Sequence, residues 1–125
     1  RARIYGYENR YEPKAAVLHY GSASTGSRYN PRKTLLASAN SIYVIGKNMP
    51  LLQIILNLPF LAAGFLIKFL FFAIKGMGKE YAAGIKNGFS ISMKNQKVLF
   101  RIKHLPNYCK IQLELWINII RRFRA

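Results

Sequence analysis

The sequence predicts an α-rich fold, with one short strand near its start and membrane-associated helices toward its end. Twenty Lys and Arg residues face only four acidic residues, so the chain carries a net charge of +16 although 51% of its residues are hydrophobic. Residues 51–74 form an apolar run with a single charge, Lys68. Residues 108–124 place apolar and basic side chains on opposite sides of a predicted helix. Strong basicity with long apolar runs indicates an anionic membrane surface as a partner.

The composition also excludes several classes of function. The single cysteine, Cys109, excludes an internal disulfide and a cysteine-based zinc site. His19 and His104 lie far apart in the sequence, and with so few carboxylates no complete acid–base pair or protein-only metal site is visible. The high apolar content argues against a disordered nucleic-acid tail, and no nucleic-acid-binding motif is present. We therefore expect no nucleic-acid partner.

Residues 1–30 are expected to contain the end of a helix, a short strand and a loop. The opening "RARIYGY" has the character of a last helical turn that ends at Gly6. Pro13 disfavours helix beyond this point, and Ala15–His19 is the predicted strand. The small and hydroxylated residues of "GSASTGSRYNP" indicate a loop. Because the chain starts without Met or a signal-peptide pattern, we expect it to be a piece of a longer protein.

A helix is predicted from about Pro31 to Asn48. Asn30 is a suitable N-cap residue, and Pro31 suits the first helical position because its missing N–H would have no partner there. Gly46, Asn48 and Pro50 are expected to end the helix. Its apolar side is marked by Leu35, Leu36, Ala39, Ile42, Tyr43 and Ile45.

Residues 51–74 are expected to form one apolar helix. Such a helix is about 36 Å long, enough to cross a hydrocarbon core of roughly 30 Å. Polar or small positions in and just after it repeat at spacings that place them on one narrow stripe. These positions are Gln53, Asn57, Gly64, Lys68, Lys75 and Lys79. A helix lying in the membrane plane needs a polar stripe and a spanning helix does not, so we favour in-plane or re-entrant burial.

The last part of the chain is expected to be a basic helical tail. Residues 79–104 form a predicted helical connector weakened by Gly84 and Gly88, and Pro106 interrupts the chain again. The segment that follows is amphipathic and suits the headgroup zone of a membrane. The expected membrane contacts are Lys68, Lys75, Trp116, Arg121, Arg122 and Arg124. The alternative is that these helices pack on one another in an ordinary core.

Residues 1–50 carry several short motifs in a defined order. "RARIYGY" is followed by a Pro, then by "AVLHYGSASTG", and then by "NPRKTLLASANSIYVIGKNMP". In this order and spacing the segment resembles the C-terminal part of bacterial family-two glycosyltransferases, and most closely the rhamnosyltransferase-like members. The Arg of the family's Arg-Asn pair is replaced by Ala39. The matching positions are Arg1, Arg3, Gly6, Tyr7, Pro13, Ala16, His19, Gly21, Ser22, Ser24, Gly26, Asn40, Lys47, Asn48 and Pro50.

This resemblance implies that residues 1–48 are the C-terminal edge of a GT-A α/β domain. An apolar membrane-associated helix would follow over residues 49–76, and a basic amphipathic tail over residues 77–125. The implied activity is inverting sugar transfer from a nucleotide-sugar donor to a glycan acceptor, lipid-linked in many members, for cell-surface polysaccharide. The implied location is the cytoplasmic face of the bacterial inner membrane, peripheral or monotopic. The family places the catalytic base and most ligands of a divalent metal, Mg²⁺ or Mn²⁺, upstream of Arg1, so we expect the isolated chain to be inactive.

The resemblance assigns two roles within this chain. His19 stands where family members place a histidine near the metal, and the following loop closes over the donor diphosphate. That loop comprises Gly21, Ser22, Ser24, Thr25, Gly26 and Arg28. From the residues alone, His19 also fits a strand-terminal residue bonded to a carbonyl, and the loop fits a plain surface loop. A second interpretation of the whole chain is a small basic monotopic membrane protein without enzymatic activity.

Overall fold

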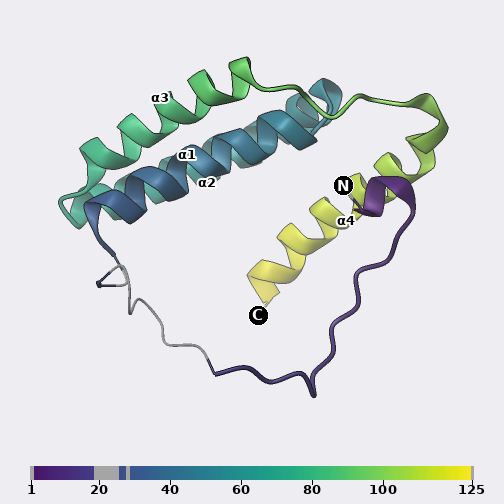
Figure 1. Cartoon of the computed structure of the whole chain (residues 1–125), viewed down its shortest axis with the longest axis horizontal. Coiled ribbons are helices and arrows are strands. Elements are labelled where there is room, and N and C mark those ends of the chain that lie inside the picture. The colour runs from purple at the N-terminus through teal and green to yellow at the C-terminus, as the bar shows by residue number, and fades with distance from the viewer. Residues whose placement is uncertain (1, 19–25, 28, 125) are drawn as a thin grey trace. The chain divides into compact units, whose positions relative to one another are not determined.

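The computed structural model describes residues 2–18, 26–27 and 29–124, and the regular structure in these ranges is helical throughout. The predicted α-rich character is therefore confirmed. The chain divides into two compact units. Leu18–Val98 form one, which we call the three-helix unit, and Arg1–Val17 with Leu99–Ala125 form the other, which we call the terminal unit. Figure 1 shows the helices of each unit.

The three-helix unit contains α1 (Pro31–Asn48), α2 (Leu51–Ile74) and α3 (Gly78–Lys94). The predicted bounds of α1 are confirmed. The side-chain oxygen of Asn30 accepts a hydrogen bond from the backbone N–H of Lys33 at 2.8 Å, which satisfies one of the unpaired donors of the first turn. Gly46 lies inside the helix rather than at its end, and α2 continues as a helix through Pro59.

Helices α1 and α3 approach each other through small residues. A Cβ atom added at Gly84 would lie 1.9 Å from the Ser38 hydroxyl oxygen and 2.4 Å from the Leu35 carbonyl oxygen. A Cβ atom at Gly88 would lie 2.6 Å from the carbonyl oxygen of Ala39. The two glycines that we expected to weaken a helical connector therefore let two backbones come together. Small residues four apart are a common way for helices to pack closely in membranes.

Many buried residues of the three-helix unit are small or polar, whereas most large apolar side chains of α2 are on the outside. Tyr81 is the largest buried side chain, and burial raises the pKa of its hydroxyl. An apolar cavity of about 240 Å³ lies where all three helices meet. Its lining includes Ile42 of α1, Leu58 of α2 and Phe89 of α3. The other buried residues of the unit are Thr34, Ser38, Ala39, Ile42, Gln53, Asn57, Met77, Gly84 and Gly88.

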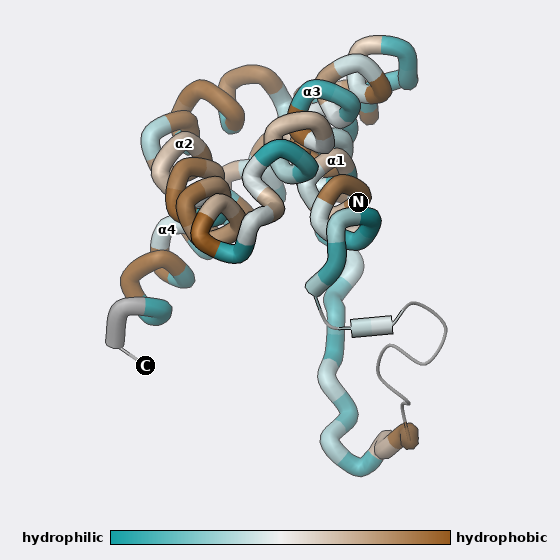
Figure 2. The backbone as a smooth tube through the Cα atoms, turned by 90° about the vertical axis from the view of Figure 1, so that its left-hand side faces the viewer, coloured by the Kyte–Doolittle hydropathy of each residue, from teal (hydrophilic) through white to brown (hydrophobic). Residues whose placement is uncertain are grey.

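The polar stripe of α2 begins inside the unit and not at its surface. Gln53 is 8% exposed and Asn57 is 5% exposed, and the Asn57 side-chain amide donates to the Gln53 carbonyl oxygen at 2.7 Å. Lys68 and Lys75, farther along the stripe, are exposed. Figure 2 shows how strongly hydrophobic residues concentrate along α2, compared with the mixed colouring of α1 and α3. The first half of helix α2 therefore turns its polar side chains toward the neighbouring helices, whereas Lys68 in the second half is exposed.

The terminal unit contains two short 3₁₀ helices, η1 (Ala2–Tyr5) and η2 (Ile102–His104), and helix α4 (Leu105–Arg124). Ile4 of η1 is buried, and its carbonyl oxygen accepts a hydrogen bond from the Asn107 side chain at 3.0 Å. The ring of Tyr5 meets the ring of His104 edge-on, with 4.9 Å between centroids. The predicted helical ending at Gly6 is confirmed as a 3₁₀ turn, and Gly6 has a φ of +89°.

The strand predicted for Ala15–His19 is wrong where it can be examined. Residues Ala15–Leu18 have no strand structure, and His19 lies outside the described residues. Val17 and Leu18 are 87% and 98% exposed. A strand is held by hydrogen bonds to a neighbouring strand, and the described ranges contain no such neighbour. The chain turns at Pro13 instead, where the Ala15 N–H donates to the Glu12 carbonyl oxygen at 3.2 Å.

The close contact between α1 and α3 is tested by Gly84→Ala. The added methyl group meets the Leu35 carbonyl, so we expect the free energy of unfolding to fall by about 1–3 kcal/mol. Denaturant unfolding in detergent micelles, followed by circular dichroism, measures this change. Gly64→Ala is the matched control, because nothing lies within 4 Å of a Cβ atom there.

In Gly64→Ala only the helix propensity changes, so stability should rise by roughly 0.5–1 kcal/mol. Equal stabilisation by the two substitutions would show that α1 and α3 do not pack this closely.

Candidate functional site

The exposed side of α2 is the largest apolar surface of the three-helix unit. Helix α2 is long and apolar enough to cross a membrane, and only 6% of its most apolar stretch is buried. Contiguous apolar patches of this kind mark surfaces that contact a membrane or a partner. The exposed residues with large apolar side chains are Leu51, Leu52, Ile55, Leu56, Leu58, Phe60, Leu66, Ile67, Phe69, Leu70, Phe71 and Ile74. We call this set the α2 apolar face.

The exposed sides of the other two helices are more polar. Helix α1 exposes Arg32 and Asn40, and α3 exposes Lys79, Lys86 and Lys94. Helix α3 also exposes Phe89 and Met93. Lys68 is the single charged residue among those of α2. Leu36 and Val44 of α1 and Ile91 of α3 are exposed as well. The apolar surface of the unit is therefore concentrated on α2 and extends onto α1, and most of the exposed cationic residues of its helices lie on α3.

An aromatic and cationic cluster lies at the end of α2. The Lys75 ammonium lies 5.1 Å from the ring centroid of Tyr29 and 5.2 Å from that of Phe71. Tyr29 in turn meets Phe71 edge-on, with 5.6 Å between centroids. Lys and Tyr side chains combine an apolar body with a polar tip, which suits the level of lipid headgroups. The membrane contact of Lys75 stays a prediction.

Helix α4 is amphipathic, as predicted. Tyr108 and Gln112 are buried, and burial together with the nearby Tyr5 raises the pKa of Tyr108. Arg121, Arg122 and Trp116 are exposed, whereas the side chain of Arg124 lies outside the described part. Exposed apolar residues accompany them, namely Leu105, Leu113, Leu115, Ile117 and Ile120. Basic and apolar groups needed for membrane contact are thus both accessible on this helix.

Arg3 and Glu114 form an ion pair that joins η1 to α4. The hydrogen bond from Arg3 holds the pKa of the Glu114 carboxyl below its usual value, with smaller contributions from the charges of Arg3, Lys110 and Arg121, while burial acts in the opposite direction. The two residues are 111 positions apart, so no local pattern in the sequence indicated this contact.

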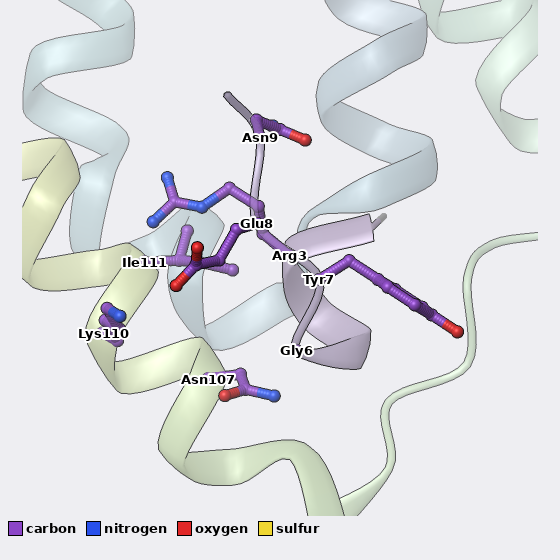
Figure 3. Close-up of a pocket in the computed structure, with 8 residues that line it drawn as sticks. All are labelled: Arg3, Gly6, Tyr7, Glu8, Asn9, Asn107, Lys110 and Ile111. Atoms are coloured by element: carbon purple, nitrogen blue, oxygen red, sulfur yellow. The ribbon is translucent and has the colours of Figure 1, made fainter. Parts of the chain in front are cut away.

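A pocket of about 400 Å³ lies beside this ion pair (Figure 3). Its lining includes the charged residues Arg3, Glu8 and Lys110 and the amide side chains of Asn9 and Asn107. Figure 3 shows the Tyr7 ring directed away from the other labelled side chains. Because cationic and anionic groups both line the pocket, it selects no single ligand charge.

The residues that the resemblance assigns to metal and diphosphate binding lie almost entirely outside the described residues. These are His19, Gly21, Ser22, Ser24, Thr25 and Arg28. Gly26 is described, with a φ of +73°. The Lys33 ammonium donates to the carbonyl oxygens of Gly26 and Ser27, at 3.5 and 2.8 Å. Over the described ranges, no three His, Cys, Asp or Glu side chains come together to hold a metal ion.

No match to this chain was found among protein-family models, curated proteins or solved structures.

The Arg3–Glu114 pair is tested by Arg3→Gln. We expect the pKa of Glu114 to rise toward its ordinary value, because the substitution removes the charged donor that lowers it. Carbon NMR titration of the side-chain carboxyl measures the change, and Arg101→Gln in the same unit is the control. A titration curve that stays at the wild-type position in Arg3→Gln would contradict the pairing.

The Arg3–Glu114 pair also makes the stability of the fold depend on pH. Since folding lowers the pKa of Glu114, the pair stabilises the fold above the unfolded-state pKa of Glu, and this contribution is lost as the pH falls through the folded-state pKa. The acid-induced loss of stability should therefore be smaller in Arg3→Gln than in the wild type.

Proposed function

We propose that this chain attaches a protein to an anionic membrane surface, with α2 immersed in the apolar layer. The observation that carries this proposal is the α2 apolar face, twelve large apolar side chains exposed on a helix with one charge. Burying a single Leu or Ile side chain contributes about 1.5–3 kcal/mol, so leaving this face in water is costly. The net charge of +16 favours negatively charged headgroups.

The arrangement of the three helices supports in-plane immersion rather than a span. The polar residues Gln53 and Asn57 of α2 are buried within the unit, and the exposed sides of α1 and α3 carry Arg32, Lys79 and Lys86. A unit with one apolar and one basic side lies best along a membrane, with α2 below the headgroups and α1 and α3 above them.

We further propose that the attached protein is an inverting, family-two glycosyltransferase of the GT-A fold. The support is the order of motifs over residues 1–50, from Arg3 and Gly6 to Lys47 and Pro50. The partners are then a nucleotide-sugar donor and a glycan or lipid-linked acceptor at the cytoplasmic face of the bacterial inner membrane.

Within this proposal, the chain contributes little of the chemistry itself. A divalent metal would neutralise charge on the leaving diphosphate, and His19 is the residue of this chain proposed to hold it. The loop from Gly21 to Arg28 would cover the diphosphate. Lys33 binds the backbone of Gly26 and Ser27 and so fixes the end of that loop to the start of α1. The membrane attachment keeps the reaction centre close to a lipid-linked acceptor.

A second candidate is a small monotopic membrane protein without enzymatic activity. Helix α1, which lies in the segment that resembles the glycosyltransferases, packs against α3 through Ser38 and Gly84. It therefore belongs to the same compact unit as the membrane helix α2. This packing favours a chain whose whole central part serves the membrane.

Membrane attachment predicts binding of the full chain to lipid vesicles. The chain should sediment with phosphatidylglycerol vesicles more strongly than with phosphatidylcholine vesicles, and salt should release part of it, because each Lys or Arg near an anionic surface adds about 1 kcal/mol. Ile67→Gln with Leu70→Gln should weaken binding to both vesicle types by roughly tenfold or more.

Ala82→Gln with Ala83→Gln on the exposed side of α3 is the matched control, and it should bind like the wild type. If the two double variants behaved alike, the α2 apolar face would not be the surface that enters the membrane.

The enzyme proposal predicts the sequence encoded upstream of Arg1. An Asp-x-Asp motif, followed later by Glu-Asp-x-Asp directly before Arg1, is expected because the resemblance places the metal motif and the base there. Sequencing the gene upstream of this segment checks it. A start codon immediately before Arg1 would remove the enzyme and leave the second candidate.

A further inference from the structure

A groove of about 490 Å³ runs between α1 and α2. Two contacts show that the two helices run in opposite directions. Tyr29, just before α1, contacts Phe71 near the end of α2, and the Thr34 hydroxyl donates to the Met77 sulfur at 3.4 Å. The groove therefore has a polar end, lined by Asn40 and Lys68, and an apolar end lined by Val44, Phe60 and Leu61.

Lys68 gives the polar end its charge. Its side chain is exposed, and the two ion pairs found over the described ranges, Arg3–Glu114 and Arg10–Glu8, do not involve it. An ammonium group on a membrane-immersed helix is costly unless an opposite charge lies beside it. Because α2 is proposed to lie along the membrane beneath the headgroups, the flexible stem of Lys68 can bring its ammonium group to a headgroup phosphate.

We propose that this groove binds one anionic phospholipid, with its phosphate at Lys68 and Asn40 and an acyl chain along Val44, Phe60 and Leu61. The proposal rests on the membrane attachment proposed above and names a specific site within it. The charge of Lys68 and the amide of Asn40 complement a phosphate. The apolar lining selects an amphiphile over a free phosphate ion, because only the amphiphile fills both ends of the groove.

The full chain in detergent micelles, with palmitoyl-oleoyl phosphatidylglycerol added, provides the test. Native mass spectrometry counts the lipid molecules retained on each chain. We expect one tightly bound lipid on the wild type. Lys68→Met keeps the length of the side chain and removes its charge, so it should weaken retention roughly tenfold or more. Lys86→Met, on the exposed side of α3, is the matched control and should retain the lipid.

A second variant tests the apolar part of the groove. Gly64 lines the groove, and a Cβ atom added there meets no atom within 4 Å, so the larger side chain of Gly64→Leu has room to enter the groove. We expect Gly64→Leu to lose the bound lipid although Lys68 is intact. Glycerol phosphate, which has no acyl chains, should not compete with the lipid. Competition by glycerol phosphate would indicate a simple phosphate site and overturn the proposal.

The outcomes separate this inference from membrane attachment itself. Wild-type retention in both Lys68→Met and Gly64→Leu would overturn the groove as a lipid site, whatever the vesicle result. Failure of the wild-type chain to bind vesicles would overturn membrane attachment, whereas retention of lipid in detergent is measured without vesicles. Equal retention of phosphatidylcholine would also overturn the proposal, because the zwitterionic headgroup does not need the charge of Lys68.

Discussion

The close approach of α1 and α3 is the constraint on which the rest of the three-helix unit depends. Gly84 and Gly88 bring the two backbones so near that a Cβ atom added at either glycine would collide with α1. Small and polar residues therefore make up much of the interior, and most large apolar side chains of α2 are on the outside. Packing of this kind gains little from the hydrophobic effect in water, whereas an apolar layer covers the exposed face of α2 directly. In the proposed attachment, the apolar layer of a membrane would cover the face of α2 that the unit leaves exposed.

Local patterns predicted the helices but not their partners. Asn30 and Pro31 located the start of α1, because a cap and a proline act on the turn that contains them. Periodicity found the polar stripe of α2, yet it did not show that Gln53 and Asn57 face other helices instead of water. The predicted strand failed because a strand depends on a partner that the local sequence does not specify. The spacing of Gly84 and Gly88, from which the sequence predicts only a weakened helix, is also a signal for close packing.

Helix α1 is part of both proposed functions, sugar transfer and membrane attachment. Its sequence lies in the segment on which the glycosyltransferase proposal rests, and its inner side packs within the three-helix unit through Ser38 and Ala39. If α1 belonged to both the catalytic domain and the three-helix unit, it would connect the reaction centre rigidly to the bilayer. The height of the reaction centre above a lipid-linked acceptor would then be fixed. The hydrogen bond from the Lys33 ammonium to the Ser27 carbonyl oxygen extends this connection to the end of the proposed diphosphate loop.

The most direct test is the depth of α2 in a bilayer. With Cys109 replaced by Ser, a spin label is placed at Ile67→Cys on α2 or at Lys86→Cys on α3, and its accessibility to oxygen and to a water-soluble nickel complex is measured on phosphatidylglycerol vesicles. The account predicts that the label at residue 67 collides with oxygen and is shielded from nickel, while the label at residue 86 is open to nickel. Equal exposure of both labels to nickel would contradict it.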